Sequence, residues 1–285
     1  MMKNIRIGVI GCGGIAIGKH LPEIKKSIGG EIYAICDTDD NALHATGEKY
    51  GIPKDRRFKN YMDLINCVDV DAVDICTPNH LHCSTAQAAV LAGKPFCIEK
   101  PVGINSEEVK HLKEAAEKAG VKSMVCFSYR FMPAVRYAKY LIEQGILGKI
   151  NAVYAQYLKS SAFIEGRRLD WRFEKSFARY GVSGDLGVHL IDLATFLAGD
   201  IKRVCADIGI VVKERKRLDS EEYAPVETDD YCNFLANMEG GASATFSISR
   251  CATGNTNYIR AEIYGDKGGI RFNLNESDRL EVCKD

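Results

Sequence analysis

The sequence predicts an α/β protein in which a doubly wound parallel sheet is followed by an α+β domain with a mostly antiparallel, open sheet. Three observations predict this fold class. Strand-like and helix-like segments alternate up to residue 126, which is typical of a parallel sheet covered by helices on both faces. A glycine-rich turn directly follows the first strand-like segment. Beyond Arg130, strand-like runs follow one another with short turns between them, as in antiparallel sheets.

The first 126 residues alternate between short β-rich runs and helical stretches. The helix expected at Ser106–Ala119 opens with Ser106 ahead of two glutamates, which suit a helix N-terminus, and it ends before Gly120. The other expected helices are Asn41–Tyr50 and Ser84–Ala92, and the expected strands are Ile5–Ile10, Ile32–Cys36, Ala72–Cys76, Phe96–Ile98 and Ser123–Phe127.

Residues 127–285 show a different pattern of secondary structure, with two expected helices and a series of strands. The helices are Ala134–Gln144 and roughly Gly187–Leu197. Glycine-rich turns at 239–241 and 265–269 separate strands that we expect to be antiparallel. These strands are Ile150–Leu158, Val204–Val212, Tyr231–Met238, Ser243–Ser249, Tyr258–Tyr264 and Ile270–Leu274.

The composition favours a soluble protein with a small-molecule partner. Basic and acidic residues number 38 each, so the chain has no net charge that would attract nucleic acid or an anionic membrane. We see no signal peptide and no apolar run of the length that a membrane helix needs. The eleven cysteines are scattered without a Cys-x-x-Cys pair. We therefore expect reduced thiols, a cytoplasmic location and no metal site.

The turn after the first strand has the spacing of a dinucleotide-binding motif. Gly11, Gly13 and Ala16 form a G-x-G-x-x-A pattern that also includes Gly14 and Ile15. The first glycine permits a tight turn, the second lets the backbone approach a pyrophosphate, and the small Ala16 allows a helix to pack closely. A helix N-terminus there would favour the phosphate charge. The sequence thus predicts a dinucleotide-binding domain over residues 1–126.

Asp37 lies at the end of the second expected strand. A carboxylate there accepts hydrogen bonds from the adenosine ribose and repels a 2′-phosphate. We therefore expect NAD as the cofactor, with NADP less favoured. Aspartate is also a common turn residue, which is the alternative interpretation of this position.

Two further segments carry ionisable groups. Glu99-Lys100-Pro101 follows an apolar strand, at the edge where open α/β sheets bind ligands. Lys100 there can donate to a substrate oxygen as charge develops. In a helix starting near Asp185, the side chains of Asp185, His189 and Asp192 would share one face. A histidine among Leu and Ile is often a core residue, but the neighbouring acid favours a proton acceptor at His189.

These motifs together resemble the glucose–fructose oxidoreductase, inositol dehydrogenase and rhizopine-catabolism family. The resemblance rests on the glycine turn, Thr77-Pro78-Asn79-His80-Leu81-His82, Glu99-Lys100-Pro101, Tyr129–Pro133, Trp171-Arg172 and Gly184–Asp192. It implies a Rossmann domain, a sheet-rich substrate-binding and oligomerisation domain at 127–285, and an active site between them. The implied catalytic residues are Lys100, Asp185 and His189. The implied cofactor contacts include Thr77, Pro78, Asn79, His82, Glu99 and Lys100. The implied substrate contacts are Lys100, Tyr129, Arg130, Trp171, Arg172, Asp185 and His189.

Several of these residues have a second interpretation. Trp171 is equally compatible with a core position, and Arg172 with a surface charge. His80 and His82 suggest metal ligands, but no third ligand accompanies them. Members of this family usually continue past the position of Asp285 into a helix that packs on the first domain. We therefore expect that helix to be absent and the chain to be a truncated form.

The resemblance implies an NAD-dependent oxidoreductase that moves a hydride between the nicotinamide and a hydroxyl-bearing carbon of a sugar, inositol or related polyol. A non-catalytic, NAD-responsive regulator on the same fold and an NAD-dependent glycosidase remain the alternatives. We also expect a homodimer or homotetramer. Small and apolar residues on both faces of the strand at 242–248 predict a subunit interface there.

Overall fold

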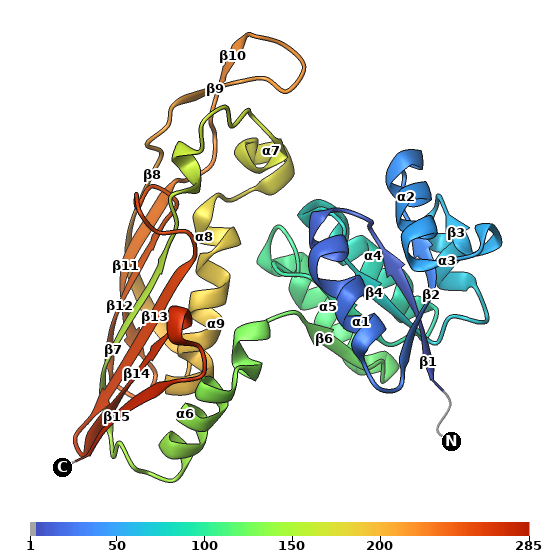
Figure 1. Ribbon diagram of the computed structural model, residues 1–285. Helices are drawn as coiled ribbons and strands as arrows, with labels where there is room; N and C mark the ends of the chain where they lie inside the picture. The colour runs from blue at the N-terminus through green and yellow to red at the C-terminus, as the bar shows by residue number, and fades with distance from the viewer. Residues whose placement is uncertain (1–3, 285) are drawn as a thin grey trace. The chain divides into compact units, whose positions relative to one another are not determined.

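The computed structural model describes residues 4–284 and divides into two compact units (Figure 1). The first unit ends at Cys126 and the second begins at Phe127. Each unit has its own hydrophobic core and is described separately below.

The first unit is built on a six-stranded parallel sheet with the strand order β3-β2-β1-β4-β5-β6. The order reverses at β1, where neighbouring strands leave in opposite directions, and ligands of open α/β sheets bind at such a point. The parallel sheet predicted from the alternating pattern is confirmed. The strands are β1 (Ile5–Ile10), β2 (Gly30–Cys36), β3 (Arg57–Phe58), β4 (Ala72–Ile75), β5 (Phe96–Ile98) and β6 (Ser123–Val125).

Helices connect these strands, and α4 begins earlier than the sequence predicts, whereas α5 has the predicted bounds. Helix α4 begins at Asn79, not at Ser84, because Pro78 caps it and its first turn includes His80 and His82. Helix α5 is capped by Asn105, whose side chain accepts the Glu108 N–H in a capping box. The helices are η1 (Ala16–His20), α1 (Leu21–Lys26), α2 (Asp40–Tyr50), η2 (Lys54–Arg56), α3 (Tyr61–Asn66), α4 (Asn79–Leu91) and α5 (Ser106–Ala119).

The second unit contains a seven-stranded sheet with the order β15-β14-β13-β7-β12-β11-β8. All neighbouring strands are antiparallel except β7 and β12, which run parallel. This confirms the expected mostly antiparallel open sheet. A separate two-stranded ribbon pairs β9 with β10. The strands are β7 (Ile150–Leu158), β8 (Ile201–Gly209), β9 (Glu214–Lys216), β10 (Tyr223–Pro225), β11 (Tyr231–Met238), β12 (Ser243–Ser249), β13 (Tyr258–Gly265), β14 (Gly268–Asn273) and β15 (Leu280–Lys284).

Helices cover one face of this sheet, and the core of the unit lies between them and the strands (Figure 1). Alternate residues of β12, including Ala244, Phe246 and Ile248, point into this core. The intervening Ser243, Thr245 and Ser247 lie on the opposite face. Of the small and apolar residues predicted on both faces of β12, the apolar ones therefore lie on the core side and the small polar ones on the other. The helices are η3 (Ser128–Phe131), α6 (Pro133–Glu143), η4 (Ser161–Phe163), η5 (Trp171–Phe173), α7 (Lys175–Ala178), α8 (Val182–Asp185), α9 (Gly187–Ala198) and η6 (Leu274–Glu276).

Within residues 4–284, no single helix has the length and apolar character needed to cross a membrane. The stretch Lys175–Asp185 together with Gly187–Ala198 reaches that length and composition only as a pair bent by 42°. Most of the large apolar side chains of α9 belong to the core of the second unit.

Candidate active site

The glycine-rich turn leaves β1 and enters a helix, as the motif predicts. Gly11 has a positive φ of 98°, and a Cβ there would lie 2.6 Å from the Cys76 carbonyl oxygen. Only glycine fits this close approach between the turn and the end of β4. A Cβ at Gly13 or Gly14 would meet nothing within 4 Å. Ala16 is fully buried, whereas Ile15 is exposed. The turn therefore presents bare backbone at the start of a helix.

Asp37 follows β2 and lies beside this turn. One of its carboxylate oxygens accepts the Cys12 N–H at 2.7 Å, and the other accepts the Asp39 N–H at 2.9 Å. The bond to Cys12 fixes the carboxylate next to the glycine turn. Each carboxylate oxygen has a second lone pair that remains available to a ribose hydroxyl.

The segment from Thr77 to His82 joins β4 to α4. Thr77 Oγ1 is buried without a hydrogen-bond partner. His82 is 1% exposed, and its ring nitrogens lie 2.8 Å from the Thr77 carbonyl oxygen and 2.6 Å from that of Pro101. This ring therefore braces the loops after β4 and β5 from inside the protein. Burial lowers the pKa of His82, against hydrogen bonds that favour the charged ring. Pro78 and Asn79 lie at the start of α4, with Pro78 exposed.

Glu99-Lys100-Pro101 lies at the end of β5, and the Lys100-Pro101 peptide bond is cis. Glu99 Oε2 accepts the Lys100 N–H at 3.1 Å, and Oε1 lies 3.0 Å from Nε2 of His20. Burial disfavours the ionised Glu99, but the hydrogen bond and charge of His20 outweigh it and lower the pKa of Glu99. Glu99 therefore fixes the backbone of Lys100 through contacts inside the first unit.

In the second unit, Asp185 and His189 lie on either side of a break. Asp185 ends α8 and is exposed, and the axis bends by 42° before α9 begins at Gly187. The prediction of one continuous helix face for Asp185, His189 and Asp192 is therefore wrong. Asp192 is buried and pairs with Arg130, whose Nε lies 2.7 Å from its Oδ2.

His189 lies in an aromatic surrounding that the sequence did not reveal. Its ring centroid is 5.0 Å from that of Tyr129, 6.1 Å from Phe127 and 6.3 Å from Tyr157. The Tyr157 hydroxyl lies 3.3 Å from that of Tyr129 and donates to Asn257 at 2.8 Å. Burial, together with Tyr129, raises the pKa of Tyr157, which keeps the phenol protonated. Tyr157 and Asn257 come from β7 and the loop before β13, and no motif marked them.

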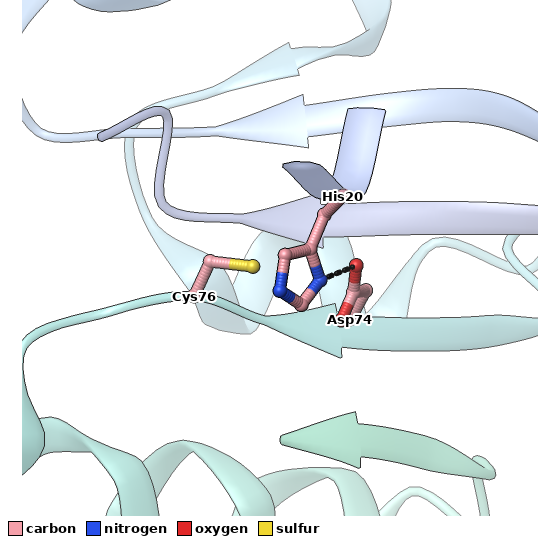
Figure 2. Close-up of side chains that lie close together, drawn as sticks. All are labelled: His20, Asp74 and Cys76. Carbon is pink, nitrogen blue, oxygen red and sulfur yellow. Dashed lines mark hydrogen bonds and ion pairs between the residues drawn. The ribbon is translucent and has the colours of Figure 1, made fainter. Parts of the chain in front are cut away.

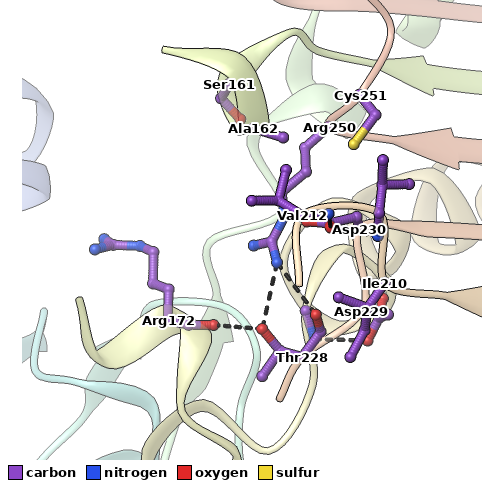
Figure 3. A network of polar contacts seen from close by, with 12 residues as sticks. Ser161, Ala162, Arg172, Ile210, Val212, Thr228, Asp229, Asp230, Arg250 and Cys251 are labelled. Carbon is purple, nitrogen blue, oxygen red and sulfur yellow. Dashed lines mark hydrogen bonds and ion pairs between the residues drawn. The ribbon is translucent and has the colours of Figure 1, made fainter. Parts of the chain in front are cut away.

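Trp171 and Arg172 form a short helix, η5, that a buried polar network holds in place (Figure 3). The Arg172 carbonyl accepts the Thr228 hydroxyl at 2.8 Å, and Arg250 contacts both Thr228 and Asp230. The Arg172 guanidinium is itself exposed and lies 4.4 Å above the Trp171 ring. The network anchors the backbone of the segment and leaves the Arg172 side chain on the surface.

Phe173, the last residue of η5, has its ring fully buried among three guanidinium groups. Arg167, Arg215 and Arg250 lie 4.7, 4.4 and 4.6 Å from its centroid. No local motif marks this cluster, because Arg215 and Arg250 lie far from Phe173 in the sequence. Cation–π contacts of this kind stabilise a packed structure, so we interpret the cluster as support for η5.

Two family models match the chain, one for each unit. Residues 5–127 match the oxidoreductase family with an NAD-binding Rossmann fold, and residues 135–271 match the GFO/IDH/MocA C-terminal domain. The chain belongs to the GFO/IDH/MocA family of oxidoreductases. The resemblance inferred from the motifs is therefore confirmed.

Members of the GFO/IDH/MocA family with assigned activities are similar over most of this chain. Levoglucosan dehydrogenase from Pseudarthrobacter phenanthrenivorans is 36% identical over 236 residues, which cover 79% of this chain and 60% of that protein. Myo-inositol 2-dehydrogenase from Thermotoga maritima is 28% identical, covering 93% of this chain and 74% of that protein. A levoglucosan dehydrogenase structure in complex with NADH and L-sorbose has a TM-score of 0.91 at 33% identity, covering 99% of this chain and 76% of that one. The chain thus spans between 60% and 76% of the length of these GFO/IDH/MocA relatives.

The first unit has features that fit the NAD of its GFO/IDH/MocA family. Gly13 and Gly14 leave the backbone open where a pyrophosphate would lie, at the start of a helix. Asp37 lies beside that turn and suits the ribose hydroxyls. The buried Thr77 hydroxyl lacks a partner and can bind a polar group.

Proposed function

We propose that this protein is an NAD-dependent dehydrogenase or reductase acting on a hydroxyl-bearing carbon of a sugar, inositol or related polyol. The observation that carries the proposal is the family match along both units, in relatives that are named sugar and inositol dehydrogenases. The chain also retains an ionisable residue at each position that the chemistry needs, Lys100, Asp185 and His189. NAD, when bound, supplies the redox chemistry by accepting a hydride from the substrate carbon.

Each unit has its own task in this proposal. The first unit holds the cofactor through the glycine turn, Asp37 and the loops after β4 and β5. The second unit binds the substrate, and its open sheet associates with further copies of the chain.

His189 takes the proton of the substrate hydroxyl in this mechanism. An imidazole titrates near neutral pH and is suited to this step. The rings of Phe127, Tyr129 and Tyr157 restrict the motion of His189 and limit the access of water. Asp185, at the end of α8 before the bend, positions the substrate or the imidazole.

Lys100 donates a hydrogen bond to the substrate oxygen and stabilises its developing negative charge. Its backbone N–H is held by Glu99, which is in turn held by His20. The loop of Lys100 is braced from the other side by His82 through the Pro101 carbonyl. Lys100 is thus presented from a fixed backbone, which favours a precise donor geometry.

The test is a panel of polyols, aldoses and nucleotide sugars, each assayed for reduction of added NAD. On an active substrate, Lys100→Ala and His189→Ala should each lower turnover by about 10²–10⁴-fold, the usual contribution of general acid–base assistance. Lys110→Ala and His111→Ala replace exposed residues of α5 and should leave turnover unchanged. Unfolding curves for all four variants separate catalysis from folding.

Three results would contradict this proposal. Near-normal turnover of His189→Ala removes His189 from the chemistry. NAD binding without turnover on any panel member indicates a regulator on the same fold. Release of an aglycone without net NAD reduction indicates a glycosidase.

The proposed assembly is a homodimer or homotetramer formed through the open face of the seven-stranded sheet. Leu235, Thr245 and Tyr154 are paired neighbours on adjacent strands of that face, and Leu235 and Tyr154 are 60% and 50% exposed. Tyr154 also contacts the ring of Tyr264. Leu235→Lys should lower the molar mass measured by light scattering, whereas Leu91→Lys, on an exposed helix end of the first unit, should not. A monomeric parent protein would contradict the proposed assembly.

We propose a reducing compartment, the cytoplasm, as its location. All eleven cysteines are free, and several are buried among apolar side chains as in proteins of reducing compartments. Cell fractionation tests this, and recovery of the native protein from an oxidising compartment would contradict it.

A further inference from the structure

A cluster of ligand-type side chains lies on one face of the sheet in the first unit, on the strands β4, β5 and β6. Asp74 pairs with Cys97 in the sheet register, and the ladder continues with Cys126 N–H bonded to the Ile98 carbonyl. Because parallel neighbours share a face and alternate residues return to it, Asp74, Cys97, Glu99 and Cys126 point to the same side. The sequence separates them by up to 52 positions, so no local motif reveals the cluster.

His20 reaches this cluster from the helix above the sheet. It is the last residue of η1, a π-helical segment of the kind that often marks functional sites. Its Nδ1 lies 2.8 Å from Asp74 Oδ2, and its Nε2 lies 3.0 Å from Glu99 Oε1. Figure 2 shows the His20 ring between Asp74 and Cys76, with the Cys76 sulfur directed toward the imidazole.

The two thiols of the cluster lie side by side. The sulfur atoms of Cys97 and Cys126 are 3.2 Å apart. Ligand atoms of Asp74, Cys97 and Cys126 lie within 4.8 Å of one another, as do those of His20, Asp74 and Cys76 and those of His20, Glu99 and Cys126. Tetrahedral zinc, with bonds of about 2.0–2.3 Å, needs ligand atoms about 3.3–3.8 Å apart. Asp74 shares one of these groups with both thiols and another with His20, so it links the thiol pair to the imidazole.

One oxygen in the cluster has no partner. Asp74 is 6% exposed, and its Oδ1 is buried without a hydrogen-bond partner, whereas Oδ2 binds His20. A buried, unsatisfied carboxylate oxygen is costly. A groove of about 520 Å³, lined in part by His20, Asp74, Cys97 and Cys126, leads from the surface to the cluster. An ion therefore has an entry path and an oxygen ligand at the end of it.

We propose that Cys97, Cys126, Asp74 and His20 form a binding site for a thiophilic divalent cation of the zinc type. Two sulfur ligands, one imidazole and one carboxylate form a donor set that suits zinc and disfavours magnesium or calcium. His20 binds through one ring nitrogen and donates the N–H of the other to a carboxylate, which is the usual arrangement around metal-bound histidine. Glu99 occupies that outer position. The ion ties η1 to β4, β5 and β6.

This site is distinct from the proposed catalytic residues, although His20 and Glu99 also hold the backbone of Lys100. It uses none of Lys100, Asp185 and His189, and it is assigned a structural role. It also revises the sequence-based expectation of a chain without metal, which rested on the lack of closely spaced cysteine pairs.

The test uses the full chain, treated with a chelator under reducing conditions and titrated with Co²⁺. We expect one Co²⁺ per chain, a thiolate-to-cobalt charge-transfer band in the near ultraviolet and the visible bands of a tetrahedral ion. Added Zn²⁺ should displace the cobalt and bleach both. Cys97→Ser and Cys126→Ser should each abolish the charge-transfer band or halve it. Glu99→Gln should weaken Zn²⁺ binding by about 10–100-fold, as loss of an outer-shell partner does.

Cys205→Ser is the matched control, because Cys205 is an exposed thiol on β8, and it should retain the full cobalt spectrum. The far-ultraviolet circular dichroism of each variant checks that it is folded. Added Zn²⁺ should raise the unfolding temperature of the parent and leave that of Cys126→Ser unchanged. The proposal is overturned if Co²⁺ binds below one equivalent, or if the charge-transfer band survives in the variant that lacks both Cys97 and Cys126. It is also overturned if the two thiols are found as a disulfide in protein purified under reducing conditions.

Discussion

Arg130 holds Asp192 through two parallel contacts, with Nε bonded to one carboxylate oxygen and Nη2 to the other. This pair joins η3 to α9 and gives both residues a structural role that does not depend on a bound substrate. Burial raises the pKa of Asp192, and the contacts from Arg130 oppose that rise. The arginine thus compensates a carboxylate that is 7% exposed.

We therefore expect Arg130→Ala to destabilise the protein by about 1–3 kcal/mol, the cost of leaving a buried acceptor without its partner. The double replacement Arg130→Met with Asp192→Leu should recover part of that loss, because it removes the buried charge as well. Denaturant unfolding measures both, with exposed Arg136→Ala as the control. A fall in turnover with unchanged stability would instead return Arg130 to the substrate site that the family resemblance implies.

Asp37 should make the protein prefer NAD over NADP, since its carboxylate is fixed beside the glycine turn by the Cys12 N–H. Asp37→Ser should bring the dissociation constants for NAD and NADP closer together. The variant weakens NAD binding and admits the 2′-phosphate of NADP. Asp40→Ser is the control, because it removes the same charge a few residues away, at the start of α2. It should leave the ratio of the two dissociation constants unchanged. Calorimetry with both cofactors checks this, and equal affinity of the parent for NAD and NADP would exclude the role.

The glycines of the turn should fall into two classes. Gly11→Ala places a Cβ 2.6 Å from the Cys76 carbonyl oxygen in a positive-φ conformation, so it should destabilise folding by about 1–3 kcal/mol. Gly13→Ala meets no atom of the protein within 4 Å. It should leave the unfolding midpoint unchanged and still weaken NAD binding, because the methyl group occupies the approach of the pyrophosphate. Equal NAD affinity in Gly13→Ala and the parent would show that the pyrophosphate binds elsewhere.

His82 should make the folded protein less stable in mild acid. Burial holds the folded-state pKa of His82 below its unfolded value of about 6.5. The unfolded chain therefore binds the proton more readily, and stability is lost as the pH falls from about 6.5 through the folded-state pKa. His82→Gln lacks this titration, so its unfolding free energy should change less between about pH 7 and pH 5. If the parent instead gains stability relative to His82→Gln on acidification, the ring is charged and donates to both the Thr77 and the Pro101 carbonyls.

Periodicity and local motifs were sufficient to predict the architecture. Helix α5 and strands β7, β11 and β12 lie at the predicted residues, because each has a clear alternation or cap. The short β9, β10 and β15 were missed, since their stability depends on pairing partners and not on their own pattern. The first turn of α4 was not predicted, because Pro78 caps the helix and it begins at Asn79, before the expected start at Ser84.

The candidate site was predictable only where its residues are close in the sequence. Gly11 to Ala16 and Glu99-Lys100 form short motifs that are visible in the sequence. Their contacts with the rest of the first unit are visible only in the structure. The contacts of His20 with Asp74 and Glu99 join segments 54 and 79 positions apart, and those of Tyr157 with Tyr129 and Asn257 join segments 28 and 100 apart. Such contacts follow from the fold, so a single sequence does not reveal them.

Strand β7 is the first strand of the second unit in the chain, yet it lies in the middle of its sheet. Both of its neighbours, β12 and β13, begin only at Ser243 and Tyr258. During synthesis, β7 therefore has no strand to pair with until most of the second unit has left the ribosome. Its hydrophobic side carries Val153, Ala155 and Tyr157. Because long loops must close before these pairings form, this unit should fold late and slowly. Until then the unpaired strand exposes apolar surface that is prone to aggregation.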